Sequence, residues 1–142
     1  MANMSNYLEG QLIGHLFRDL TFSKPSTLAI ALCTASPNDA STGGTITEVA
    51  NSNNYSRVEL APDDDNWAAI SGNNGTTSNS SAITFPTASG SWGTVTSVAI
   101  LDSATHGAGN VLFYGDLTVS KSITSGDTFS FSIGALTIQI DN

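Results

Sequence analysis

The clearest strand in this sequence is Ser26-Thr27-Leu28-Ala29-Ile30-Ala31-Leu32-Cys33. Successive side chains of a strand point to opposite faces, so the large residues at 28, 30 and 32 share one face and the small residues at 29, 31 and 33 share the other. A strand that is apolar on both faces is typical of a sheet covered on both sides. The pattern therefore predicts a central strand, with a large-residue face and a small-residue face that both need cover.

One segment of the chain has the periodicity of a helix, residues 5–20. Its apolar side chains fall at 8, 12, 13, 16, 17 and 20, which is one stripe of an amphipathic helix. Ser5 is placed to cap the first turn, because a serine hydroxyl accepts a hydrogen bond from a free amide there. The stripe must lie on a sheet or on a partner chain. The small-residue face of strand 26–33 is the natural site, since alanine lets a helix approach closely.

The rest of the chain alternates short apolar runs with turns rich in Gly, Pro, Asn and Asp. The predicted strands are 45–49, 56–60, 67–70, 82–85, 94–102 and 109–117, the last two forming a hairpin around 103–108. Residues 72–80 form a polar loop that we expect to be mobile. Residues 129–140 alternate strictly, and Gly134-Ala135 is either a tight turn or a bend within one long strand.

These elements predict a mainly β protein. About eight short strands at this spacing are typical of a β-sandwich or a jelly-roll-like barrel, here with one N-terminal amphipathic helix. The 142 residues fit one domain, 1–142, with the helix at about 5–20 and the β-rich region at about 26–140.

The charge balance excludes two classes of partner. Arg18, Lys24, Arg57 and Lys121 are the four cations, against 12 carboxylates, for a net charge of −8. Binding to nucleic acid or to an anionic membrane surface needs several clustered cations. No apolar run approaches the roughly 18 residues of a membrane span. We therefore expect neither a nucleic-acid partner nor a membrane partner.

The chain is also poor in charge overall, with 11% charged residues. Uncharged polar surface is cheaper to desolvate than charged surface, and such surfaces suit proteins that pack into assemblies. Together with the short amphipathic helix, this composition predicts a homotrimer or a similar cyclic oligomer.

No catalytic constellation is convincing. Asp102-Ser103-Ala104-Thr105-His106 places an acid, a hydroxyl and an imidazole in one loop, but a nucleophilic relay is normally assembled from distant segments on a rigid frame. His15 has no second His or Cys on its helix face that would complete a metal site. Cys33 lies in an apolar strand and is expected to be an inert core residue. We therefore expect no enzymatic activity, no catalytic residues and no cofactor.

The carboxylate cluster is Asp63-Asp64-Asp65-Asn66. Calcium requires six to eight oxygens, and the alternating Asp-x-Asp-x-Asp-Gly pattern and a distal Glu are missing here. A plain charged turn is the favoured interpretation, and whether Asp63–Asp65 bind a cation stays open. Trp67 and Trp92 have the side chains to stack on sugars, but core packing or an interface anchor suits them at least as well.

A series of short motifs, in this order, resembles a family of small tailed-phage virion proteins. The motifs are Ser5-Asn6-Tyr7-Leu8-Glu9, His15-Leu16-Phe17-Arg18, the strand at 28–34, Ile83-Thr84-Phe85-Pro86, Trp92-Gly93-Thr94-Val95-Thr96, Leu112-Phe113-Tyr114-Gly115, Ser125-Gly126-Asp127-Thr128-Phe129 and Leu136-Thr137-Ile138. The resemblance covers nearly the whole chain.

This resemblance implies a non-enzymatic structural protein located in the virion. Members of the family are often labelled tail-fibre-like. Others look like the trimeric cement, or decoration, proteins of cyanophage-type capsids, which implies a protein that bridges and stabilises capsomers. The sequence-based expectation is a trimeric cement protein bound to the major capsid protein. The alternative is a tail-fibre or tail-tip subunit that contacts a host receptor.

Overall fold

The computed structural model describes residues 2–70 and 75–140 of the 142-residue chain. This part of the chain holds one helix and short strands, which makes the protein mainly β, as predicted. In chain order the elements are β1 (Asn3–Met4), α1 (Asn6–Phe17), β2 (Leu28–Cys33), β3 (Val58–Leu60), β4 (Thr76–Ser78), β5 (Ile83–Thr84), β6 (Gly93–Leu101), β7 (Val111–Ile123), β8 (Ser130–Phe131) and β9 (Thr137–Gln139). The helix is too short and too polar to span a membrane, so no described helix is a candidate span.

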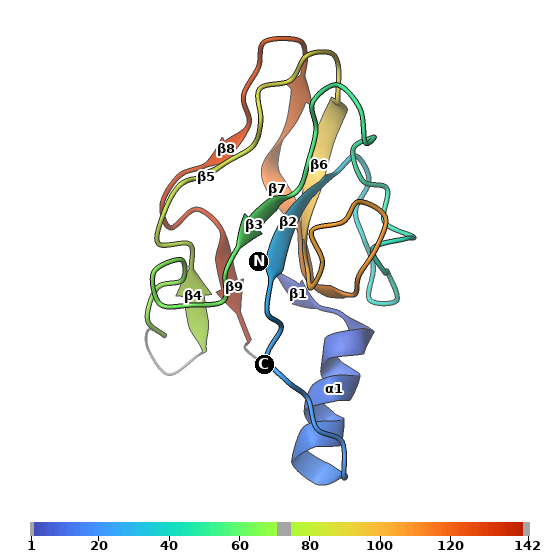
Figure 1. Cartoon of the computed structure of the whole chain (residues 1–142), viewed down its shortest axis with the longest axis vertical. Coiled ribbons are helices and arrows are strands. Elements are labelled where there is room, and N and C mark those ends of the chain that lie inside the picture. The colour runs from blue at the N-terminus through green and yellow to red at the C-terminus, as the bar shows by residue number, and fades with distance from the viewer. Residues whose placement is uncertain (1, 71–74, 141–142) are drawn as a thin grey trace.

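A five-stranded antiparallel sheet forms one layer of the fold, in the order β1-β7-β6-β2-β3 (Figure 1). The strand predicted most clearly, β2, lies inside this sheet, between β6 and β3. The predicted hairpin is confirmed and is longer than expected, because β7 runs on to Ile123 and pairs with β6 back to Gly93. The sheet is therefore built mainly from one long hairpin and the apolar strand beside it.

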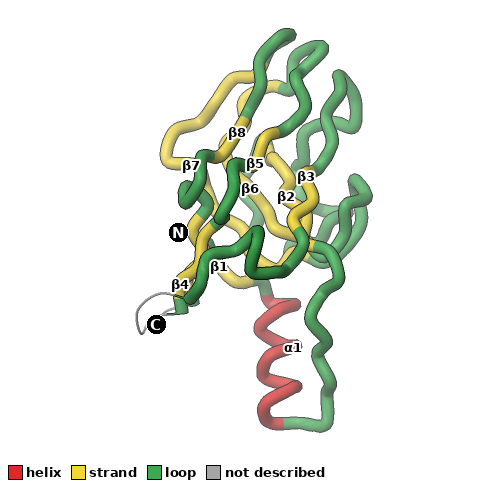
Figure 2. Tube along the Cα trace, turned by 60° about the vertical axis from the view of Figure 1, so that its left-hand side comes forward, coloured by secondary structure: helices red, strands yellow, loops and turns green. Residues whose placement is uncertain are grey.

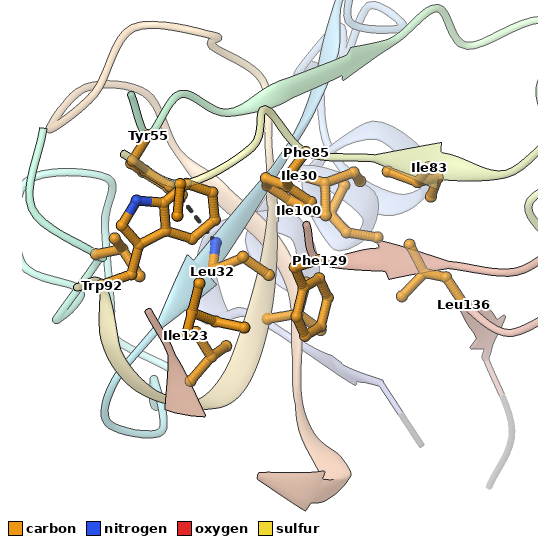
Figure 3. Close-up of a cluster of buried hydrophobic side chains, with 14 of the residues drawn as sticks. Ile30, Leu32, Tyr55, Ile83, Phe85, Trp92, Ile100, Ile123, Phe129 and Leu136 are labelled. Atoms are coloured by element: carbon orange, nitrogen blue, oxygen red, sulfur yellow. Dashed lines mark hydrogen bonds between the residues drawn. The ribbon is translucent and has the colours of Figure 1, made fainter. Parts of the chain in front are cut away.

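The second layer consists of two small sheets, β5 with β8 and β4 with β9. The main core lies between the two layers and takes the large-residue face of β2 (Figure 3). Its members include Ile30, Leu32, Tyr55, Ile83, Phe85, Trp92, Ile100, Ile123, Phe129 and Leu136. The architecture is a small sandwich and not a closed barrel, because no strand pairing joins the two layers in the described residues.

The small-residue face of β2 is covered by the segment 34–57 and not by the helix. A second core cluster there contains Ala31, Cys33 and Tyr114, with Ile46 of that segment packed against it. Backbone hydrogen bonds hold the segment in place, among them Thr34 N–H to the Thr47 carbonyl at 2.9 Å. The expectation that the helix covers this face is wrong.

Helix α1 projects from one end of the sandwich (Figures 1 and 2). The cause lies just before it, where β1 pairs with β7 in the register Asn3↔Tyr114 and Met4↔Phe113. This pairing fixes the direction of the chain at Ser5, so the helix leaves the edge of the sheet instead of crossing its face. The predicted cap is confirmed, because the Ser5 hydroxyl accepts from the Leu8 amide at 3.2 Å.

Three other predictions can be compared with the structure. Residues 45–49 and 67–70 are not strands, and each contributes one isolated bridge, Cys33↔Glu48 and Trp67↔Asn79. Gly134, at φ +74°, lies in a tight turn in which the Ala135 amide donates to the Ser132 carbonyl. This turn is not a hairpin, because β8 pairs with β5 and β9 pairs with β4. The mobile loop predicted at 72–80 falls partly on residues 71–74, outside the described residues, and includes β4.

Candidate functional site

The helix and the segment that follows it form a projecting arm, residues 6–22, which we call the α1 arm. Its root is fixed firmly. Ser5 is fully buried, its amide donates to the Leu112 carbonyl at 3.0 Å, and its hydroxyl donates to the Val111 carbonyl. Leu8, one turn further, is buried against the domain. The root of the arm is therefore part of the folded core.

The far end of the α1 arm is a tight reversal. Leu20 packs back on Gly14 so closely that a Cβ at Gly14 would lie 2.6 Å from Leu20 Cδ2. The Phe22 amide donates to His15 Nδ1 at 3.3 Å. His15 thus helps to hold the return of the chain. These contacts give the arm a defined shape over its whole length.

Apolar side chains are exposed along the α1 arm. Leu16 is 70% exposed and Phe17 is 78% exposed, and Ile13 and Leu20 are exposed as well. They make up half of the large apolar side chains that are exposed in the described part of the chain. An exposed cluster of this kind marks an interaction surface, because single exposed apolar residues are ordinary whereas contiguous patches are not.

A groove of about 350 Å³ lies beside the root of the arm, and we call it the Trp67 groove. Its apolar lining includes Leu28, Trp67, Ile70, Leu112, Phe113 and Ile138. Two carboxylates of the acidic turn, Asp63 and Asp64, stand at its rim. Lys24, just past the arm, donates from Nζ to the Pro62 carbonyl at 3.0 Å, so the chain leaving the arm runs past this rim.

A larger and more polar cleft of about 900 Å³ opens between β7 and the chain from 127 to 139. Hydroxyl groups of Thr118, Ser122, Thr128 and Ser130 line it together with Phe131. Hydroxyl and aromatic groups of this kind suit contacts with a polar ligand.

Asp102, Ser103 and His106 lie in one loop, and each has its own hydrogen-bond contact. Both carboxylate oxygens of Asp102 accept from Asn110, at 2.7 Å from its amide and 2.8 Å from its side chain. The Ser103 hydroxyl accepts from the Thr105 amide at 3.2 Å. His106 Nε2 faces the Val49 carbonyl at 2.9 Å. The three groups thus serve separate structural contacts.

A buried ion pair, which no local pattern in the sequence indicates, holds this loop in place. Arg57 pairs with Glu48 in a bidentate arrangement, and its Nη1 donates to the carbonyls of Ser103 and Ala108 at 2.7 and 2.9 Å. The Tyr55 hydroxyl donates to Glu48 at 2.9 Å. Burial first, and then the Glu48 carboxylate, raise the pKa of Tyr55. Each of these groups has a structural partner, so the cluster stabilises the fold.

The remaining candidate residues have clear surroundings. Asp63 Oδ1 accepts from the Asn66 amide at 3.0 Å and from its side chain at 2.8 Å, which closes the acidic turn. No group of three His, Cys, Asp or Glu side chains comes together as metal ligands within residues 2–70 and 75–140. Whether Asp63–Asp65 bind a cation stays open.

The two tryptophans differ. Trp92 is buried, donates from Nε1 to the Asn53 carbonyl at 2.9 Å, and packs edge-on to Tyr55, so it is a core residue and not a sugar platform. Trp67 is half-buried and lines the groove.

A small β domain that projects an apolar arm is typical of proteins that bind other protein chains. Residues 3–139 match the sequence model of a family described as podophage GP4 fiber I protein gp80. The chain belongs to this family. It is therefore a structural protein of a bacteriophage virion, as the resemblance of its motifs indicated. None of the curated proteins matches the chain.

Proposed function

We propose that this chain is a non-enzymatic fibre subunit of the phage tail, and that it assembles through its α1 arm. The observation that carries the proposal is the family membership, which spans nearly the whole chain and names a fibre protein. From the sequence, capsid cement was the first expectation and a tail-fibre subunit was the alternative. The family description favours the alternative.

The shape of the molecule supports a fibre role. The α1 arm lies at one end of the sandwich, and the loops 86–92 and 124–128 lie at the opposite end (Figure 1). The arm carries the exposed apolar side chains Ile13, Leu16, Phe17 and Leu20. These loops are held to each other, since the Ala88 amide donates to the Asp127 carbonyl at 2.9 Å. They are rich in Ser, Thr and Gly. A subunit attached at the arm end would present these polar loops to a host receptor.

Capsid cement is the second candidate. The low content of charged residues, 11%, favours it, because a surface that covers capsomers must be desolvated over a large area. A cement protein acts by binding only the assembled shell, which stabilises that shell by linkage. Its partner would be the major capsid protein.

A phage that lacks the gene for this chain separates the two candidates. For a fibre subunit, particles without the chain should adsorb poorly to host cells, and their heat stability should equal that of the wild type. For a cement protein, they should adsorb normally and lose their DNA at a lower temperature, because the packaged DNA pushes outward on an unsupported shell.

A matched pair of complementing genes sharpens this experiment. Wild-type chain supplied in trans should restore adsorption, and the Leu16→Ser/Phe17→Ser variant should not, because the arm that attaches the subunit is altered. Normal adsorption of particles without the chain would overturn the fibre proposal, whatever their heat stability.

A further inference from the structure

We infer that the α1 arm of one copy of this chain docks in the Trp67 groove of a second copy. The inference rests on the proposed assembly through the α1 arm and names the partner of that arm. It does not depend on whether the chain belongs to the tail or to the capsid. Neither surface is covered by the residues that the structure describes, 2–70 and 75–140, and each has the chemistry that the other needs.

The arm has the form of a ligand for a groove. A helix of 12 residues is about 18 Å long at roughly 1.5 Å per residue, so it extends far enough from its own domain to meet another. Ile13, Leu16 and Phe17 are exposed near its far end, and Leu20 follows on the return segment. Because Leu20 packs on Gly14 and Phe22 bonds to His15, this apolar end is already ordered before any contact forms. A preorganised side loses little conformational entropy on binding.

The groove offers a matching receptor. Its wall is apolar, with Trp67, Leu112 and Phe113 among its members, and Ile70 is 76% exposed at its edge. Burial of such aromatic and aliphatic groups at the centre of a contact supplies most of the binding energy of typical interfaces.

Charge points to the same pairing. Arg18 follows directly after Phe17, and no carboxylate pairs with it in the part of the chain that the structure describes. At the groove rim, Asp63 and Asp64 have no ion-pair partner among the described residues either. With Phe17 seated in the groove, Arg18 comes to the rim, where the two carboxylates stand. Asp19 also lies on the arm, so the complementarity depends on where Arg18 is placed and not on the net charge of the arm.

The positions of the arm and the groove on the chain allow the arm-in-groove contact to form in a closed oligomer. The groove lies at the root of the arm, since the chain leaving the arm passes its rim at Lys24 and Pro62. Arm and groove thus lie at the same end of each copy, so the contacts of an oligomer would all form at that end. Because arm and groove are different surfaces, a head-to-tail contact is heterologous and closes as a ring, such as the expected homotrimer. Reciprocal exchange of arms between two copies would instead give an isologous dimer.

Light scattering on the purified full chain gives the first test. At about 100 µM, well above the micromolar Kd of a modest interface, the wild type should be a closed oligomer. Leu16→Ser/Phe17→Ser should be a monomer. A groove variant, Ala69→Glu/Ile70→Glu, should also be a monomer. All four positions are exposed, so circular dichroism should show the wild-type fold for both.

Mixing the two variants tests the pairing itself. The arm variant keeps an intact groove and the groove variant keeps an intact arm, so a 1:1 mixture should form a heterodimer through one arm-in-groove contact. An arm-to-arm bundle would give no heterodimer, and the groove variant alone would stay oligomeric. Either of those results, or a monomeric wild type, would overturn the inference.

A charge exchange supplies a second readout. Arg18→Asp and Asp64→Arg should each weaken association by about tenfold, because each brings like charges together at the rim. The double variant Arg18→Asp/Asp64→Arg should recover most of that loss. Matched controls are Val119→Ser and Ile133→Ser, which remove exposed apolar side chains outside the arm and the groove and should leave the mass unchanged. A double variant as weak as the sum of its singles would contradict the proposed pairing.

Discussion

Arg57 and Glu48 form a bidentate ion pair inside the protein, with 2.7 Å between Nη2 and Oε2 and 2.9 Å between Nε and Oε1. Both side chains are almost completely buried. Arg57 also binds two carbonyls of the loop 103–108, and Glu48 accepts from Tyr55. The pair therefore joins the segment 34–57, which covers one face of the sheet, to the loop of the β6–β7 hairpin.

Removal of one member of this pair should be costly. Arg57→Met leaves a buried, unpaired carboxylate, and the free energy of unfolding should fall by about 3–5 kcal/mol. The double variant Glu48→Gln/Arg57→Met buries no charge and should be more stable than Arg57→Met alone. Urea denaturation measures both. A loss under about 1 kcal/mol for Arg57→Met would show that the pair is not a structural clamp.

Two glycines give a matched pair for backbone packing. A Cβ at Gly43 would lie 2.0 Å from the Ala108 carbonyl oxygen, so Gly43→Ala must displace backbone and should destabilise the protein by about 1–3 kcal/mol. Gly10 lies within α1 and has nothing within 4 Å of a Cβ, so Gly10→Ala should stabilise the protein by about 0.5–1 kcal/mol. Thermal unfolding midpoints should move in opposite directions. Equal shifts of the two unfolding midpoints would contradict the close approach of the Ala108 backbone to Gly43.

The two ends of the helix should respond differently to a charge. Leu8 is buried at the root, so Leu8→Asp should cost about 3 kcal/mol or more. Leu16 is exposed, so Leu16→Asp should change the stability of the monomer by no more than about 0.5 kcal/mol. From the sequence alone both ends of the stripe are expected to be buried, and Leu16→Asp to be disruptive. Urea denaturation should be measured at low protein concentration, because oligomerisation would otherwise add to the apparent free energy of unfolding. Unfolding of Leu16→Asp there would place the far end of the arm against its own domain.

The thiol of Cys33 should report on opening of the small-residue face. Burial first, and then the nearby Glu48 carboxylate, raise the pKa of Cys33 to about 12. At pH 8 the thiolate is therefore scarce in the folded state, and the thiol is also fully buried. A thiol reagent should label native protein very slowly and urea-unfolded protein rapidly. In the Arg57→Met variant, Cys33 should be labelled faster than in the wild type, because the weakened segment 34–57 opens more often from the small-residue face of β2. Rapid labelling of the native wild type would contradict the cover by this segment.

Local patterns predicted the central elements well. The alternation at 28–33 specified a strand with two different faces, and Ser5 specified where the helix begins, because both signals involve only neighbouring residues. The direction of the helix was not predictable in the same way. It depends on β1, a two-residue strand whose partner on β7 is more than 100 residues away in the sequence.

The candidate site was harder to predict from the sequence, because it too depends on contacts between residues that are far apart in the chain. An apolar stripe predicts that a helix buries something, but not whether the partner is its own sheet or another chain. Glu48 and Arg57 lie in turn-rich sequence, and only the fold brings them to the carbonyls of Ser103 and Ala108. The sequence around Trp67 and Trp92 did not distinguish a core residue from a surface residue. The fold places Trp92 against Asn53 and Tyr55, which makes Trp92 the core residue.

Electron cryomicroscopy of the intact virion separates a fibre subunit from a cement protein. Density for this domain should lie on the tail, in few copies, with the α1 arm at the attached end and the loops 86–92 and 124–128 facing outward. Density for the domain spread over the capsomers of the shell in hundreds of copies would contradict the fibre assignment.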